Sequence, residues 1–141
     1  MIGVVIVTHY RLAEEFLQSL ELIVGKLEHV RGIGLDPTSV TPEEMRRRIE
    51  KAIAEVDSDQ GVLVAVDMFG GTPSNLSLAF LEEGKVEVVT GLNLPMLVKI
   101  SRQKEDLLLY ELAKLARDYG RRNISVASDI LSGRERAGAD K

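Results

Sequence analysis

The feature that most limits the possible folds is an apolar, mostly β-branched run at the start of the chain that ends in a histidine. Residues 2–9 read Ile-Gly-Val-Val-Ile-Val-Thr-His, with no alternation of apolar and polar residues. Strands that are covered on both faces have this pattern, so the run predicts a buried strand of a parallel sheet. His9 then lies at the carboxyl end of the strand, where α/β sheets bind their ligands. The alternative is a hydrogen-bonded loop histidine that only begins the next helix.

The rest of the chain alternates between helical and strand patterns. Apolar residues at helical spacing predict helices over 12–24, 42–56, 75–83 and 107–119, with a further helix beginning at Met96. Apolar runs predict strands over 30–35, 61–66 and 86–89, followed by a short β-prone run over 123–128. This layout is typical of an α/β fold with a doubly wound, mainly parallel sheet, for which we expect the flavodoxin-like strand order 2-1-3-4.

The β-prone run over 123–128 leads us to expect an assembly of two chains. An open sheet edge with unpaired backbone groups pairs readily with another chain, and exchange between two identical chains satisfies both edges at once. We therefore expect a homodimer in which the short C-terminal strand is exchanged. The chain should comprise one domain over residues 1–128 and a polar C-terminal tail over 129–141.

Composition excludes several classes of function. The 141 residues contain no cysteine and only two histidines, so we expect no metal site. The chain also lacks a cofactor-binding motif, and we expect no cofactor. A net charge of −4 and an aromatic content of 4% disfavour nucleic-acid binding. No apolar stretch reaches the roughly 20 residues of a membrane span, and the amino terminus does not resemble a signal peptide. We expect a cytoplasmic protein without direct membrane insertion.

A second segment that can carry chemistry follows the strand over 61–66. Residues 67–75 read Asp-Met-Phe-Gly-Gly-Thr-Pro-Ser-Asn, and the Thr72-Pro73 pair is typical of the cap and first turn of a helix. Adjacent glycines allow close backbone approach, and the free N–H groups of a helix start bind anions such as phosphate. The expected phosphate-binding residues are Gly70, Gly71, Thr72 and Ser74. The alternative is an ordinary strand-to-helix connection.

The predicted sheet order brings these two segments together. His9 and Asp67 end neighbouring strands at the topological switch point, so their side chains are expected to meet in one crevice. A carboxylate that accepts the proton of one imidazole nitrogen leaves the other nitrogen as a nucleophile. The Thr72 hydroxyl and the helix start can hold the oxygens of a transferred phosphoryl group. His9, Asp67 and Thr72 are thus candidate catalytic residues, whereas His29, outside any motif, is expected to be solvated.

Three motifs in this order resemble a known family. Thr-His at the end of the first strand, Asp-x-Phe-Gly-Gly-Thr-Pro-x-Asn from Asp67, and Gly-x-Asn-x-Pro-Met from Gly91 are similar to the EIIA domain of mannose-type bacterial sugar phosphotransferase systems. The resemblance covers about residues 1–128. It implies a phosphotransferase in which His9 accepts a phosphoryl group from the phosphocarrier protein HPr and passes it to a IIB component. It also implies Asp67 as the partner of the histidine, and the same strand-exchanged homodimer.

Some positions depart from the commonest pattern of that family. Tyr10 stands where a glycine often follows the histidine, Phe69 where a tryptophan is common, and Thr72 where serine is frequent. Three other functions remain open: a phosphohistidine signalling module that is not coupled to transport, the phosphotransfer subunit of dihydroxyacetone kinase, and a flavodoxin-like binding domain that never carries phosphate. The last has no support from a cofactor motif, because the chain contains neither a Gly-x-Gly-x-x-Gly fingerprint nor a Walker lysine.

Overall fold

Four parallel strands form the centre of the computed structural model, which describes residues 1–104 and 106–138. They are β1 (Gly3–His9), β2 (Val30–Leu35), β3 (Val62–Val66) and β4 (Val86–Thr90). Their order is β2-β1-β3-β4 and every pairing is parallel, with Val5 of β1 opposite Arg31 of β2 and Val64 of β3. This confirms the α/β class and the flavodoxin-like order 2-1-3-4.

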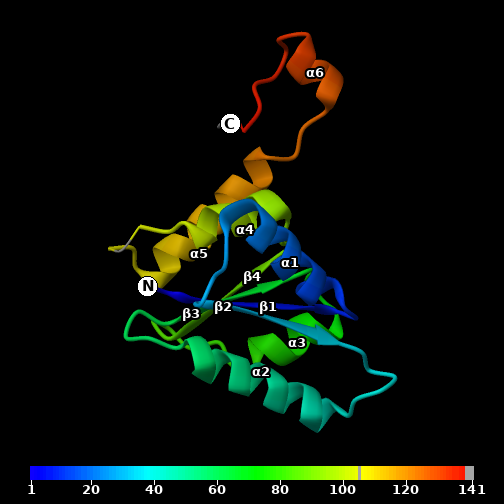
Figure 1. Ribbon diagram of the computed structural model, residues 1–141, viewed down its shortest axis with the longest axis vertical. Coiled ribbons are helices and arrows are strands. Elements are labelled where there is room, and N and C mark those ends of the chain that lie inside the picture. The colour runs from blue at the N-terminus through cyan, green and yellow to red at the C-terminus, as the bar shows by residue number, and fades with distance from the viewer. Residues whose placement is uncertain (105, 139–141) are drawn as a thin grey trace.

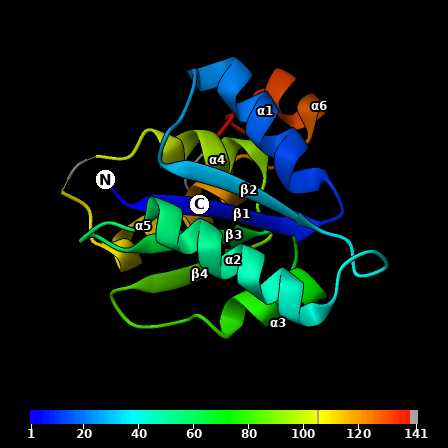
Figure 2. The same cartoon turned by 60° about the horizontal axis from the view of Figure 1, so that its bottom comes forward.

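Helices cover both faces of this sheet (Figures 1 and 2). The helices α1 (Leu12–Val24), α4 (Leu94–Ser101) and α5 (Leu109–Arg122) lie on one face, and α2 (Pro42–Val56) and α3 (Thr72–Leu78) lie on the other. Side chains of β1 alternate between the two cores: Val4 and Ile6 pack under the first group, whereas Val5 and Val7 pack under α2. Because both faces are covered, β1 is apolar along its length, as its sequence predicts.

Several helix ends follow the expected local chemistry. The Thr41 side chain caps α2 by accepting a hydrogen bond of 3.2 Å from the Glu44 N–H, and Gly25 ends α1 with a φ of 89°. The expected end of the last long helix at Gly120 is wrong, since α5 continues to Arg122. A Cβ at Gly120 would lie 3.0 Å from the Met96 side chain, so the glycine serves the close packing of α5 on α4.

The helix expected over 75–83 occupies other residues. The helix α3 begins at Thr72, with Gly71 in extended conformation as its N-cap, and ends at Leu78. Thr72 is therefore the first helical residue and not the cap. After Leu78 the backbone tightens into turns, because the N–H groups of Phe80 and Leu81 donate to the carbonyl groups three residues before them.

The strand expected over 123–128 does not form within the chain. Residues 124–126 have no regular structure, and a short helix, α6 (Ala127–Leu131), follows them. Ile124 and Val126 are 72% and 60% exposed. The alternation of Ile124 and Val126 favours a strand, but a strand needs a neighbour, and in Figure 1 this segment extends away from the sheet together with α6. Of the predicted polar tail, residues 139–141 lie outside the described part of the chain.

In the part of the chain that the structure describes, no helix has the length and apolar character needed to cross a membrane.

Candidate active site

The paired strands β1 and β3 bring His9 and Asp67 into direct contact. The His9 ring nitrogen Nδ1 lies 2.8 Å from Asp67 Oδ2, and the His9 backbone N–H donates to the same oxygen at 3.0 Å. The other carboxylate oxygen, Oδ1, accepts the Met68 N–H at 3.1 Å. An ionised carboxylate only accepts hydrogen bonds, so the proton of a neutral imidazole resides on Nδ1, and Nε2 carries the lone pair. The His9 side chain is 44% exposed, whereas that of Asp67 is 13% exposed.

The two glycines of the loop after Asp67 have different roles. A Cβ at Gly71 would lie 2.6 Å from His9 Cε1 and 2.8 Å from Nε2, closer than a side-chain atom can approach. Gly71 therefore lets the backbone pack against the outward edge of the imidazole ring. Gly70 has open space around its Cα but a φ of 94°, which allows the turn between β3 and α3.

The start of α3 lies directly after Gly71. The first intrahelical bond runs from the Asn75 N–H to the Gly71 carbonyl at 2.9 Å, so the N–H groups of Thr72 and Ser74 have no acceptor within the helix. Thr72 is half-buried, and its hydroxyl is free of the capping role that its sequence suggested. Ser74 is completely buried, and its Oγ has no hydrogen-bond partner among the described residues. Because the whole residue is buried, neither the hydroxyl nor the backbone N–H of Ser74 is exposed at the surface.

Tyr10 follows the histidine in a backbone conformation that few residues adopt. Its φ is 49°, in the left-handed region, and its N–H donates to the Leu35 carbonyl at 2.8 Å. A glycine takes this conformation without steric cost, which accounts for the frequent glycine at this position in the family that the motifs resemble. Tyr10 keeps the same turn and adds a side chain that is 60% exposed. The positive φ has no signal in the sequence of this chain.

Sequence reasoning also missed Thr8. This buried residue precedes the histidine, and its Oγ1 accepts the Ala13 N–H at 2.6 Å while donating to the His9 carbonyl at 3.1 Å. The hydroxyl ties the end of β1 to the first turn of α1. A capping threonine normally accepts from an N–H two or three residues after it, whereas Thr8 and Ala13 are five residues apart. The sequence therefore did not predict this contact.

The loops that carry the site also expose large apolar side chains. Tyr10 and Leu12 follow His9, and Met68 and Phe69 follow Asp67; their exposed fractions range from 44% to 69%. Exposed apolar groups that gather in this way mark surfaces for other proteins. No group of three or more His, Cys, Asp or Glu side chains suited to a metal occurs within residues 1–104 and 106–138.

The other histidine is not solvated as expected. His29 precedes β2, and its Nε2 is buried without a hydrogen-bond partner in the described part of the chain. Burial, and to a smaller extent the positive charge of the amino terminus, lowers the pKa of His29 below its ordinary value. The polar sequence around His29 gave no indication of this burial.

Known proteins share this fold and these motifs. Residues 3–116 match the family profile described as PTS system fructose IIA component. The chain is 34% identical over 125 residues to the PTS system mannose-specific EIIAB component of Escherichia coli K12, which covers 87% of the chain and 38% of that protein. It is 26% identical over 113 residues to the PTS system sorbose-specific EIIA component of Lacticaseibacillus casei, covering 77% of the chain and 78% of that protein.

Solved structures agree with these relatives. The phosphotransferase system component EIIA from Streptococcus agalactiae superposes with a TM-score of 0.80 at 29% identity, over 91% of this chain and 98% of that one. The PTS IIA protein associated with the fucose utilization operon from Streptococcus pneumoniae gives a TM-score of 0.80 at 27% identity, over 92% and 95%. The chain therefore belongs to the mannose-type EIIA family of the bacterial sugar phosphotransferase system.

Proposed function

We propose that the protein is a cytoplasmic phosphocarrier of the phosphoenolpyruvate-dependent sugar phosphotransferase system, which accepts a phosphoryl group from phospho-HPr on His9 and passes it to a IIB component. Membership in the EIIA family gives the general role of a phosphotransferase system component. The observation that carries the specific proposal is the contact of His9 Nδ1 with Asp67, which directs the Nε2 lone pair away from the carboxylate and toward Gly71, on a side chain that is 44% exposed.

The geometry suits nucleophilic attack on phosphorus. In the proposed step, the Nε2 lone pair of neutral His9 forms a bond to phosphorus while the bond between phosphorus and the donor nitrogen breaks, and the donor ring keeps that electron pair. The His9 ring keeps its Nδ1 proton and becomes positively charged. The Asp67 carboxylate, 2.8 Å from Nδ1, stabilises this charge. The reverse sequence of bond changes delivers the phosphoryl group to the IIB component.

The start of α3 is the proposed support for the phosphoryl oxygens. Gly71 borders Nε2, and the chain continues from it into Thr72 and Ser74, whose N–H groups have no acceptor within the helix; Thr72 is half-buried and Ser74 is fully buried. Oxygens that gain negative charge in a loose transition state are stabilised by such donors. We assign the Thr72 hydroxyl a supporting part in this site, together with the backbone of Gly70.

The partners of this site are proteins that carry their own phosphoryl acceptor or donor. A small crevice for a sugar is not needed, because in this proposal the sugar is bound by other components. The exposed apolar side chains Tyr10, Leu12, Met68 and Phe69 give HPr and the IIB component a surface to contact. Tyr10, at a position where glycine is frequent, changes the shape of that surface in this chain.

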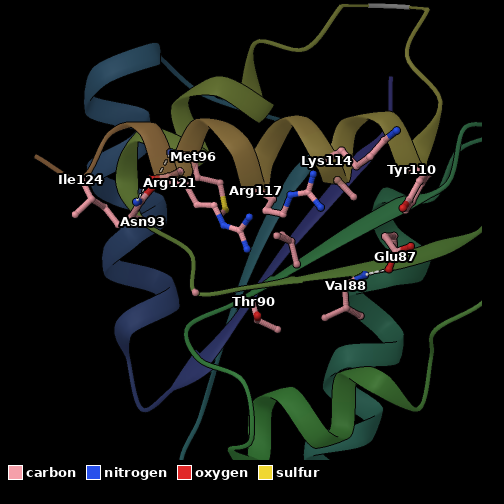
Figure 3. A pocket seen from close by; sticks show the side chains of 14 residues that line it. Glu87, Val88, Thr90, Asn93, Met96, Tyr110, Lys114, Arg117, Arg121 and Ile124 are labelled. Carbon is pink, nitrogen blue, oxygen red and sulfur yellow. Dashed lines mark hydrogen bonds between the residues drawn. The ribbon is translucent and has the colours of Figure 1, made fainter. Parts of the chain in front are cut away.

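We also propose the strand-exchanged homodimer, with residues 1–128 as the EIIA domain and 129–141 as its tail. The strand β4 is at the end of the sheet, and a groove of about 330 Å³ lies between it and α5. Figure 3 shows Val88 and Thr90 of β4 on one side of this groove and Arg117 and Arg121 of α5 on the other. Residues 124–126 of a second chain, which are exposed here, can pair with β4 and bury Ile124 and Val126.

One experiment tests the phosphocarrier proposal. The purified chain is incubated with phosphoenolpyruvate, enzyme I and HPr, and its intact mass is measured. We expect one phosphoryl group per chain, lost in acid and retained in base as a phosphoramidate should be. A chain that stays unmodified, or an acid-stable phosphate on serine or threonine, would contradict the proposal.

A separate experiment tests the dimer. Sedimentation of the full chain and of a chain that ends at Asn123 should give a dimer and a monomer, respectively. The shortened chain keeps His9 and Asp67 and should still accept phosphate. A monomeric full chain at micromolar concentration would overturn the dimer without affecting the proposal for His9.

A further inference from the structure

A second, larger cavity lies at the amino-terminal end of the sheet, away from His9. Its volume is about 800 Å³, and it is bordered by the turn before β4 and by the start of α5. Its apolar lining includes Leu81, Leu108 and Tyr110, which are 52%, 70% and 62% exposed. Three large apolar side chains exposed together in one hollow indicate a surface that another segment covers.

The rim of this cavity is acidic. Asp59, Glu83, Glu87 and Asp106 line it, and no lysine or arginine does so among the described residues. An apolar floor with an acidic rim favours an occupant that combines exposed aliphatic side chains with a nearby positive charge.

The cavity continues the groove at the edge of β4. Glu87 and Tyr110 line both hollows. Ile124 of the same chain lies at the other end of the groove, beside Asn93 (Figure 3). A segment of a second chain that entered at this end would run antiparallel to β4 and leave it at Val86. The strand β4 has five residues and the extended segment 124–126 has three, so this segment covers more than half of β4 and α6 follows on the side of the cavity.

The end of this chain has the chemistry that such an occupant requires. The helix α6 has no buried residue, and Leu131 is 87% exposed. Arg134 is held against Asp129 at 2.8 Å, which keeps the turn after α6 compact, and the exposed Arg136 follows two residues later. An aliphatic side chain and a cation thus occur in the order in which the segment would meet the cavity floor and then its rim.

We propose that α6 and residues 132–138 of a second copy of this chain fill the cavity, with Leu131 on Leu108 and Tyr110 and with Arg136 near Glu83 and Asp106. The inference rests on the proposed strand exchange and extends it, because the tail becomes part of the interface between the two chains. The interface then reaches the end of the sheet opposite His9, so dimer contacts and phosphoryl transfer use separate surfaces.

A disulfide experiment tests the placement directly, since the chain has no cysteine. One preparation carries Glu83→Cys and another Arg136→Cys; the two are mixed under conditions that let subunits exchange, and then oxidised. We expect a covalent dimer on a non-reducing gel, with the disulfide between the two substituted positions identified by mass spectrometry. Lys51→Cys on the exposed side of α2, mixed with Arg136→Cys, is the control and should give no covalent dimer.

A substitution experiment tests the apolar contact without any crosslink. Leu131→Asp should raise the dimer dissociation constant at least about tenfold, because the burial of a leucine side chain is lost. Leu22→Asp, at an equally exposed position on α1, is the matched control and should leave the constant unchanged. Neither residue contacts the core, so both variants should fold and should accept phosphate at the normal rate.

Each outcome decides between the proposals. A full chain that is dimeric, but forms no disulfide and is unaffected by Leu131→Asp, would overturn the docking of the tail and leave the strand exchange standing. A full chain that is monomeric would overturn both. A protein with Glu83→Cys and Arg136→Cys in the same chain that closes its disulfide within one monomer would show that the tail covers its own cavity, which also contradicts the inference.

Discussion

The two histidines of this protein lie at opposite ends of the sheet and have opposite surroundings. His9 ends β1 at the carboxyl edge, where Asp67 binds one ring nitrogen, the other lies beside Gly71, and the side chain is 44% exposed. His29 precedes β2 at the amino edge, where Nε2 is buried without a partner in the described chain and burial lowers the pKa of the ring. A nucleophilic imidazole needs an accessible nitrogen and a group that stabilises its positive charge. The surroundings of His9 therefore suit the proposed nucleophile, and those of His29 do not.

Removing each histidine in turn is the strongest test of this contrast. His9→Ala should abolish phosphorylation by enzyme I and HPr, because Nε2 of the other histidine, His29, is buried and has no partner among the described residues. His29→Ala should leave the phosphorylated fraction nearly unchanged. Intact mass after incubation with phosphoenolpyruvate measures both variants. Phosphate on the His9→Ala protein, or its loss from the His29→Ala protein, would contradict the contrast between the two histidines.

Changing the partner of His9 tests why its surroundings matter. Asp67→Asn keeps the size of the side chain and an oxygen for the His9 N–H, but loses the charge that stabilises the imidazolium ring. Phosphoryl transfer should slow by about a hundredfold, with little change in the melting temperature. Rapid-quench measurement of transfer from phospho-HPr gives the rate. An unchanged rate would mean that the contact of 2.8 Å is structural.

Crowding the ring of His9 should have a smaller effect. Gly71→Ala places a Cβ within 2.8 Å of Nε2 in the present geometry, so the ring or the loop must move. We expect transfer to slow by about tenfold. Gly25→Ala is the control: its φ of 89° makes alanine unfavourable there too, but nothing lies within 4 Å of its Cβ and it is remote from His9. It should lower stability by about 1 kcal/mol without slowing transfer.

The smallest expected effect is the contribution of His29 to the pH dependence of the free energy of unfolding. Its lowered pKa means that below pH 6.5, the ordinary value, the unfolded chain binds a proton more readily than the folded one. The free energy of unfolding should therefore be at its full value above pH 6.5 and should decrease as the pH falls below it. His29→Gln should remove part of this decrease, which urea denaturation at a series of pH values can detect. An identical pH dependence in both proteins would show that the burial of His29 has no energetic consequence.

The sequence predicted the features of the fold that depend on residues close together along the chain. The uninterrupted apolar runs identified β1 and β3 because strands covered on both faces have no reason to alternate. The expected sheet order made these two strands neighbours. Because the carboxyl ends of neighbouring parallel strands lie at the same edge, it also predicted that His9 and Asp67 are close together. The cap at Thr41 and the end of α1 at Gly25 also depend only on adjacent residues.

The features that were missed depend on contacts between distant residues. The left-handed turn at Tyr10 is held by Leu35 of another strand, and Gly120 stays helical because it packs on Met96. Ile124 and Val126 alternate as a strand should, yet residues 124–126 pair with no strand in the described part of the chain. None of these contacts has a sequence signal short enough to recognise in a single chain.

One oxygen of Asp67 binds both the backbone and the ring of His9. In the proposed role, His9 meets a protein partner in every transfer. A ring without a fixed orientation would make some of these encounters unproductive. Here the pairing of β1 with β3 places Asp67 beside His9, and this contact fixes the orientation of the ring. In the proposed role we therefore expect the rate of phosphoryl transfer to be limited by the binding and release of the protein partners.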